Sequence, residues 1–130
     1  MKYRKKRLWK YEVIETVSFQ VDILDIEYNN GYIDLHKDGL LVIKKNYRWD
    51  GPSGPTIDTP AFMVGSLVHD ALYQLIRQGT LNIKNHKEIA DKLLKTLCIE
   101  HGMSKFRAWY VYKSVKRFGF SSCRSDILIV

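Results

Sequence analysis

The stretch that decides the fold is Thr59-Pro60-Ala61-Phe62-Met63-Val64-Gly65-Ser66-Leu67-Val68-His69-Asp70-Ala71-Leu72-Tyr73. Thr59 can cap a first helical turn, Pro60 suits its first position, and Gly79 can close the far end. The apolar residues in between cover most of the helix, and such helices are usually buried. A buried carboxylate needs a partner or an opening to water, so His69 and Asp70 mark a candidate site.

A loop rich in Gly and Pro, from Trp49 to Pro60, leads directly into this helix. Gly51 and Gly54 allow the backbone to turn and to approach a ligand closely. Backbone carbonyls beside a carboxylate suit a hard cation such as Ca²⁺, which prefers oxygen ligands. The loop also holds Asp50 and Asp58, each of which could add a ligand or cap a turn.

A second helix is predicted after Gly79. Asn85 and Glu88 resemble a capping box, the apolar residues that follow have helical spacing, and Gly102 ends the pattern. Asp91 sits at the edge of the apolar stripe. If the two helices pack antiparallel, as a short connection favours, Asp91 could reach His69. The alternative is an exposed first-turn acid favoured by the helix dipole.

A third helix is predicted from the cap Ser104 through Phe118, ended by Gly119. The final residues 127–130 are apolar and suit an added strand or a packed tail. The side chains expected to face inward on the third helix are Phe106, Trp109, Tyr110 and Val115.

The region from Tyr11 to Tyr47 is rich in β-branched residues, and apolar and polar residues alternate through Tyr32-Ile33-Asp34-Leu35-His36. Asn29-Asn30-Gly31 and Lys37-Asp38-Gly39 are typical of hairpin turns. We expect three or four short antiparallel strands. His36 is expected to be polar surface, and the acids expected on the solvated face are Asp22, Asp25, Glu27 and Asp34.

The sequence therefore predicts one α+β domain over residues 1–130, with an N-terminal antiparallel sheet followed by three helices, the first two packed antiparallel. Its parts are a basic, frayed arm at 1–10, a β-region at 11–48, the loop and helices at 49–119, and a tail at 120–130. A chain of 130 residues with 45% hydrophobic and 27% charged residues suits an ordinary globular domain.

The net charge of +7 is concentrated at the two ends. Residues 1–10 and 103–124 each carry six Lys or Arg and no Asp or Glu, whereas the middle of the chain is acidic. Cationic ends can meet nucleic acid, anionic lipid headgroups or an acidic partner. The alternative is a solubilising tail and a solvated helix face.

Two cysteines, Cys98 and Cys123, show no metal-type spacing, which favours folding in a reducing compartment. The N-terminus lacks the pattern of a secretory signal, and no apolar run approaches the ~20 residues of a membrane span. We expect synthesis in a host cytoplasm and leave association with a virion open.

The motifs together resemble those of phospholipase A2. The shared features are the loop Trp49-Asp50-Gly51-Pro52-Ser53-Gly54, the helix motif His69-Asp70-Ala71-Leu72-Tyr73, and the later Ala90-Asp91. The likeness covers about residues 47–95 and is greatest to the compact, disulfide-free versions in parvovirus capsid proteins. The chain also resembles a small domain family of unknown function that is common in phage and prophage genomes.

This resemblance implies a role for each residue. His69 would be the general base, Asp91 would hold the imidazole, and Tyr73 would orient Asp91 or the base. Asp70 would hold Ca²⁺ together with loop carbonyls near Trp49 and Gly51. The cation would stabilise the oxyanion that develops on an ester carbonyl. Asp50 could add a further ligand.

Three functions are therefore open. The first is a Ca²⁺-dependent, phospholipase A2-like ester hydrolase of a phage or prophage that acts at an anionic membrane. The second is a non-catalytic phage virion or accessory protein that keeps the His69–Asp70 helix as a structural element. The third is nucleic-acid binding through the basic ends.

Overall fold

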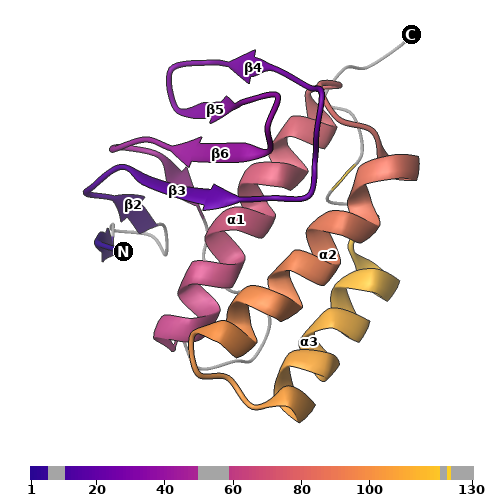
Figure 1. The fold of residues 1–130 in the computed structure, drawn as a ribbon. Helices are drawn as coiled ribbons and strands as arrows, with labels where there is room; N and C mark the ends of the chain where they lie inside the picture. The colour runs from indigo at the N-terminus through magenta and orange to yellow at the C-terminus, as the bar shows by residue number, and fades with distance from the viewer. Residues whose placement is uncertain (6–10, 50–58, 121–122, 124–130) are drawn as a thin grey trace, which may run out of the picture. The chain divides into compact units, whose positions relative to one another are not determined.

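The structure is a computed structural model, and it describes residues 1–5, 11–49, 59–120 and 123 (Figure 1). The described chain contains two antiparallel sheets followed by three helices, which confirms the predicted α+β class. It divides into two compact units, Met1–Asp58 and Thr59–Val130.

One sheet of the first unit has three strands in the order β1-β2-β7. These strands are β1 (Tyr3–Lys5), β2 (Tyr11–Val13) and β7 (Arg48–Trp49), and the neighbours are antiparallel. The rings of Tyr3, Tyr11 and Trp49 pack together with centroids 5.6–6.0 Å apart. The prediction of a frayed arm is therefore wrong for Tyr3–Lys5, because pairing with β2 and ring packing hold this segment. Residues 6–10 lie outside the described residues.

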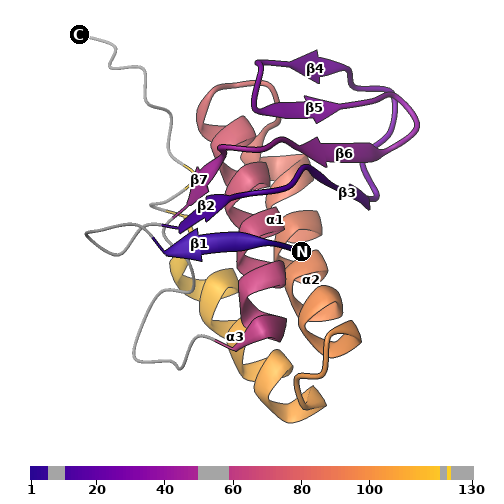
Figure 2. The same ribbon diagram turned by 90° about the vertical axis from the view of Figure 1, so that its left-hand side faces the viewer.

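The other sheet has four antiparallel strands in the order β3-β6-β5-β4 (Figure 2). They are β3 (Val17–Gln20), β4 (Tyr28–Asn29), β5 (Ile33–Leu35) and β6 (Leu40–Ile43). Five described strands therefore lie between Tyr11 and Tyr47, more than the predicted three or four. The reason is their length, since elements of two to four residues are too short to show a clear alternation.

Both predicted hairpin turns are present. Gly31 and Gly39 have φ angles of +87° and +88°, which favour glycine. The first turn joins β4 to β5 and the second joins β5 to β6. Asp22, Asp25 and Glu27 are exposed as expected. By contrast, Asp34 is half-buried and its carboxylate lies 3.1 Å from Lys44 Nζ.

Helix α1 (Pro60–Arg77) opens the second unit and begins and ends as predicted. The Thr59 hydroxyl accepts a hydrogen bond of 3.3 Å from the backbone N–H of Phe62, which caps the first turn. Gly79, just after the last turn, has a φ of +83°. Most of α1 is buried, including the middle turns that carry His69.

Helix α2 (Ile83–Glu100) begins two residues before Asn85, so the predicted capping box is wrong. Asn82 is the cap instead, and its side chain accepts a 2.8 Å hydrogen bond from the N–H of Asn85. Two Asn residues three apart offered equivalent caps, and Glu88 favoured the later one. The earlier start places Asp91 more than two turns into the helix.

Helices α1 and α2 run antiparallel, side by side (Figure 1). Gly65 is one reason for their close approach. A Cβ at this position would lie 2.7 Å from Cys98 Sγ and 2.9 Å from Leu94 Cδ1, both on α2. The missing side chain allows the helices to meet one turn before His69.

Helix α3 (Lys105–Phe118) has the predicted bounds, with Ser104 as its cap, and packs along α2. The predicted buried face is wrong for Phe106, Trp109 and Tyr110, which are exposed. Their size and apolar character favoured the interior, but Ala108 and Val111 are the α3 side chains that join the buried cluster. The buried cluster formed by the three helices comprises Ala61, Phe62, Leu94, Cys98, Met103, Ala108 and Val111, with Ile99 and Val115 packed against it.

Both cysteine thiols are free and buried. No helix in the described ranges combines the length and apolar character needed to cross a bilayer. The prediction of a strand or packed tail at residues 127–130 falls outside the described residues.

Candidate functional site

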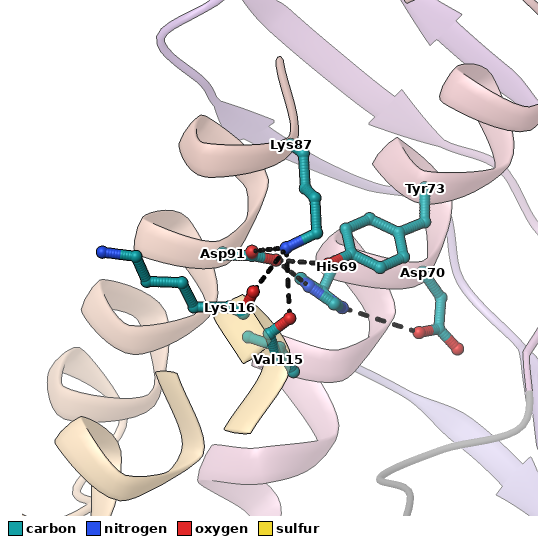
Figure 3. A network of polar contacts seen from close by, with 7 residues as sticks. All are labelled: His69, Asp70, Tyr73, Lys87, Asp91, Val115 and Lys116. Atoms are coloured by element: carbon teal, nitrogen blue, oxygen red, sulfur yellow. Dashed lines mark hydrogen bonds and ion pairs between the residues drawn. The ribbon is translucent and has the colours of Figure 1, made fainter. Parts of the chain in front are cut away.

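The candidate site is a buried polar network between α1 and α2 (Figure 3). His69 Nε2 lies 2.8 Å from Asp91 Oδ1, and the Tyr73 hydroxyl donates a 2.5 Å hydrogen bond to the same oxygen. His69 and Tyr73 are one helical turn apart, and their ring centroids are 4.0 Å apart. The structure thus brings together three of the predicted site residues across the antiparallel helix pair.

Lys87 is the member of the network that the sequence interpretation missed. Its Nζ donates a 2.7 Å hydrogen bond to Asp91 Oδ2, so both carboxylate oxygens have partners. The side chain also reaches α3, where Nζ lies 3.1 Å from Val115 O and 3.3 Å from Lys116 O. The signal was its position four residues before Asp91, because such a pair shares a helix face.

The network is almost fully withdrawn from solvent. Residue exposure is 7% for His69, 4% for Lys87 and 1% for Asp91. Asp91 is therefore not the exposed first-turn acid that was the alternative interpretation. Charges at this depth persist only when they are paired and hydrogen-bonded. Three donors on one carboxylate provide that compensation.

These contacts also set the charge states. Burial alone would raise the pKa of Asp91, but hydrogen bonds from His69, Lys87 and Tyr73 outweigh it, and the pKa lies below its ordinary value. Burial, together with the hydrogen bond to Asp91, raises the pKa of Tyr73 above its ordinary value. At neutral pH, Asp91 is therefore an acceptor and the Tyr73 phenol remains a donor.

The ionised carboxylate fixes the tautomer of His69. An acceptor beside Nε2 requires the proton on that nitrogen, so the lone pair of the neutral ring is on Nδ1. Nδ1 faces Asp70 Oδ1 at 4.0 Å. The Asp70 side chain is 34% exposed, unlike the rest of the group. The basic nitrogen therefore points towards Asp70, whose side chain is the more exposed one of this pair (Figure 3).

The C-terminal end of α3 completes the site. In the last turn of α3, Lys87 donates to the carbonyls of Val115 and Lys116, and Val115 O also accepts the backbone N–H of Gly119. Gly119 leaves space for Tyr73, because a Cβ at this position would collide with the Tyr73 hydroxyl. The Lys87 ammonium also lies 4.4 Å from the centroid of the Phe120 ring. Three helices thus hold one carboxylate.

The other predicted ligands are Trp49, Asp50 and Gly51. Trp49 belongs to the first unit, where it is buried and its ring packs with those of Tyr3 and Tyr11. Asp50 and Gly51, like Asp58, lie outside the described residues. Their predicted part in a cation site stays a prediction.

The chemistry of Asp70 suits a hard cation, because its carboxylate is partly exposed. The buried carboxylate of Asp91, by contrast, is bonded to Tyr73 and other donors. Among the residues that the structure describes, no three or more His, Cys, Asp or Glu side chains gather as a metal site. Asp70 is therefore the one predicted carboxylate ligand that lies in the described chain.

This geometry can perform general base chemistry. The imidazole is oriented by an ionised acid, its free lone pair faces the accessible side, and a proton taken up at Nδ1 would be stabilised by Asp91. Comparisons with known protein families, with curated proteins and with solved structures found no match to this chain.

Proposed function

We propose that the chain is a phospholipase A2-like ester hydrolase of phage or prophage origin that acts on phospholipid at an anionic membrane. The observation that carries the proposal is the orientation of His69, whose Nε2 is bound by Asp91 while Nδ1 faces Asp70. A general base needs an oriented ring, a basic nitrogen and a stabilised protonated form, and this arrangement supplies all three.

In the proposed reaction, His69 Nδ1 takes a proton from water as the water oxygen attacks the ester carbonyl carbon. The imidazolium is stabilised by Asp91 and returns the proton to the departing alcohol oxygen. The products are a fatty acid and a lysophospholipid, and His69 is neutral again. Tyr73 and Lys87 hold Asp91 in place through its two oxygens.

The proposed cation is Ca²⁺, with Asp70 and the loop near Trp49, Asp50 and Gly51 as its ligands. When bound, it would supply a positive charge for the developing oxyanion. Asp70 is suited to this role because its carboxylate stands next to the basic nitrogen of His69.

The test is fatty-acid release from phosphatidylglycerol vesicles with Ca²⁺ or with a chelator. We expect wild type to be active only with Ca²⁺, and His69→Gln to lose about 10²–10⁴-fold or more of the rate. His36→Gln, at an exposed histidine of the first unit, is the matched control and should retain full activity. Asp70→Asn should raise the Ca²⁺ concentration needed for half-maximal rate. Equal rates for wild type and His69→Gln would contradict the proposal.

A second candidate function is a non-catalytic virion or accessory protein. The observation that favours it is the completeness of the buried network, in which Asp91 has three donors and Lys87 three oxygen acceptors. Such satisfied networks also occur as structural elements. Folded wild type without any release, combined with marked destabilisation of His69→Gln, would favour this second function.

A further inference from the structure

The outer face of α3 presents large aromatic side chains to solvent. Phe106, Trp109 and Tyr110 are 78%, 46% and 62% exposed, and their spacing of three and four residues places them on one stripe. We call these three residues the aromatic stripe. Exposed apolar groups that are contiguous, rather than scattered, mark interaction surfaces.

The stripe is not a displaced part of the core. Helix α3 already buries its opposite face, where Ala108 and Val111 join the cluster shared with α1 and α2. The stripe has its own internal contacts. The Phe106 and Trp109 rings stack with centroids 6.4 Å apart, and Lys113 Nζ lies 5.8 Å from the centroid of the Trp109 ring.

The charge along α3 has one sign. Five basic residues and no acid lie between Met103 and Phe120. Lys105 and Lys113 are exposed next to the stripe, and Lys116 follows one turn later. A surface that complements this face must therefore offer negative charge together with an apolar layer that accepts aromatic rings.

We propose that the aromatic stripe docks α3 on an anionic phospholipid bilayer. The rings enter the boundary between headgroups and acyl chains, and the lysines contact lipid phosphates. Helices that lie in an interface combine aromatic residues on one side with Lys and Arg beside them. This proposal deepens the proposed function, because a phospholipid hydrolase must reach a bilayer, but docking itself needs no hydrolysis.

Nucleic acid fits the same charge but fits the rings less well. Base binding uses the open faces of aromatic side chains as stacking platforms. On α3 the Phe106 and Trp109 rings stack on each other, and Lys113 lies over Trp109. These contacts engage faces of the Phe106 and Trp109 rings, so fewer open faces are left for stacking on bases.

The experiment is co-sedimentation with sucrose-loaded vesicles, either mixed phosphatidylglycerol and phosphatidylcholine or phosphatidylcholine alone. We expect wild type to prefer the anionic vesicles. The triple variant Phe106→Ser, Trp109→Ser, Tyr110→Ser should lose about tenfold or more of this affinity. Tyr32→Ser, at an exposed tyrosine of the first unit, is the matched control and should bind like wild type. Lys113→Gln should lose about fivefold, and less at high salt.

Circular dichroism of each variant shows that the fold is retained before binding is compared. Unchanged binding by the folded triple variant, or no binding by wild type, would overturn the docking proposal. So would a preference for single-stranded DNA over anionic vesicles that depends on the aromatic stripe.

The two proposals fail separately. His69→Gln should bind vesicles as wild type does while releasing no fatty acid. Hydrolysis of a dispersed short-chain phospholipid without vesicle binding would contradict the docking proposal and support the hydrolase proposal. Vesicle binding through the stripe without hydrolysis of either substrate would contradict the hydrolase proposal and support the docking proposal.

Discussion

The contact between α1 and α2 and the outer face of α3 belong to the same unit, yet they place their side chains in opposite ways. The first buries a carboxylate and an ammonium, Asp91 and Lys87. The second exposes three aromatic rings. Each arrangement is unfavourable by itself, since buried charge needs compensation and exposed apolar area gains nothing in water.

The difference lies in what compensates each region. The buried network is satisfied within the chain, by three donors on Asp91 and two α3 carbonyls near Lys87. The aromatic stripe is only partly covered by its own ring contacts. A buried polar group whose hydrogen bonds are all made within the chain suits catalysis or a rigid structure. An apolar group that is exposed to solvent suits binding to a partner.

The strongest test of this comparison uses two ion pairs on α2 that share the same spacing. Lys87–Asp91 is buried, whereas Glu88–Lys92 is exposed at both ends, with a separation of 3.3 Å. Lys87→Met should lower the free energy of unfolding by about 3–5 kcal/mol, because Asp91 stays buried with one donor fewer. Lys92→Met should lower it by about 0.3–0.5 kcal/mol. Urea unfolding measures both, and equal losses would contradict the contrast.

Close packing around the network gives the next largest effect. Gly119→Ala places a methyl group against the Tyr73 hydroxyl, and Gly65→Ala places one against Leu94 and Cys98. Each should lower the free energy of unfolding by about 1–3 kcal/mol. Only Gly119→Ala should also disturb the hydrogen bond from Tyr73 to Asp91. If fatty-acid release is observed, its rate should fall more in Gly119→Ala than in Gly65→Ala.

The pH dependence of stability contains a contribution from Asp91. Its pKa is lowered in the folded chain from the ordinary 3.8, so the unfolded chain takes up a proton first as the pH falls. The stability due to Asp91 is therefore complete well above pH 3.8 and declines as the pH falls through that value towards the folded pKa. Lys87→Met removes one cause of the shift and should make this decline shallower. Urea unfolding between pH 2 and 7 compares the two slopes, and identical slopes would contradict the assignment.

The smallest effect is expected on the exposed face. Phe106→Ser should change the free energy of unfolding by no more than about 0.5 kcal/mol, because its ring is largely in solvent. Val111→Ala on the buried face of α3 should lower it by about 1.5 kcal/mol. Thermal unfolding of both variants tests this. A loss for Phe106→Ser as large as that for Val111→Ala would place the stripe in the core.

The sequence predicted the helices well because their ends carry strong local signals. Thr59, Ser104 and Gly79 are caps or stops whose chemistry depends on neighbouring backbone groups. The start of α2 was misplaced because Asn82 and Asn85 offer the same chemistry three residues apart. The number of strands was underestimated because strands of two to four residues are too short to show a clear alternation of apolar and polar residues.

The candidate site was predicted only in part. His69, Tyr73 and Asp91 follow from helix periodicity and antiparallel packing, although their roles stay predictions. Lys87 and Gly119 did not follow, because their importance depends on where the end of α3 lies. The predicted buried face of α3 was wrong for a related reason. Apolarity alone does not distinguish a ring that packs in the core from one that faces solvent.

The bond between Lys87 and the last carbonyls of α3 limits how far this chain can be shortened. A fragment that ends after α2 would retain His69, Tyr73 and Asp91 in sequence, but the ammonium would lose its two backbone acceptors. The site formed by residues 69–91 therefore depends on Lys116, which lies 29 positions after Lys87 in the sequence. A fragment that keeps these contacts must therefore extend past Gly102 and at least through Phe120, whose ring centroid lies 4.4 Å from the Lys87 ammonium.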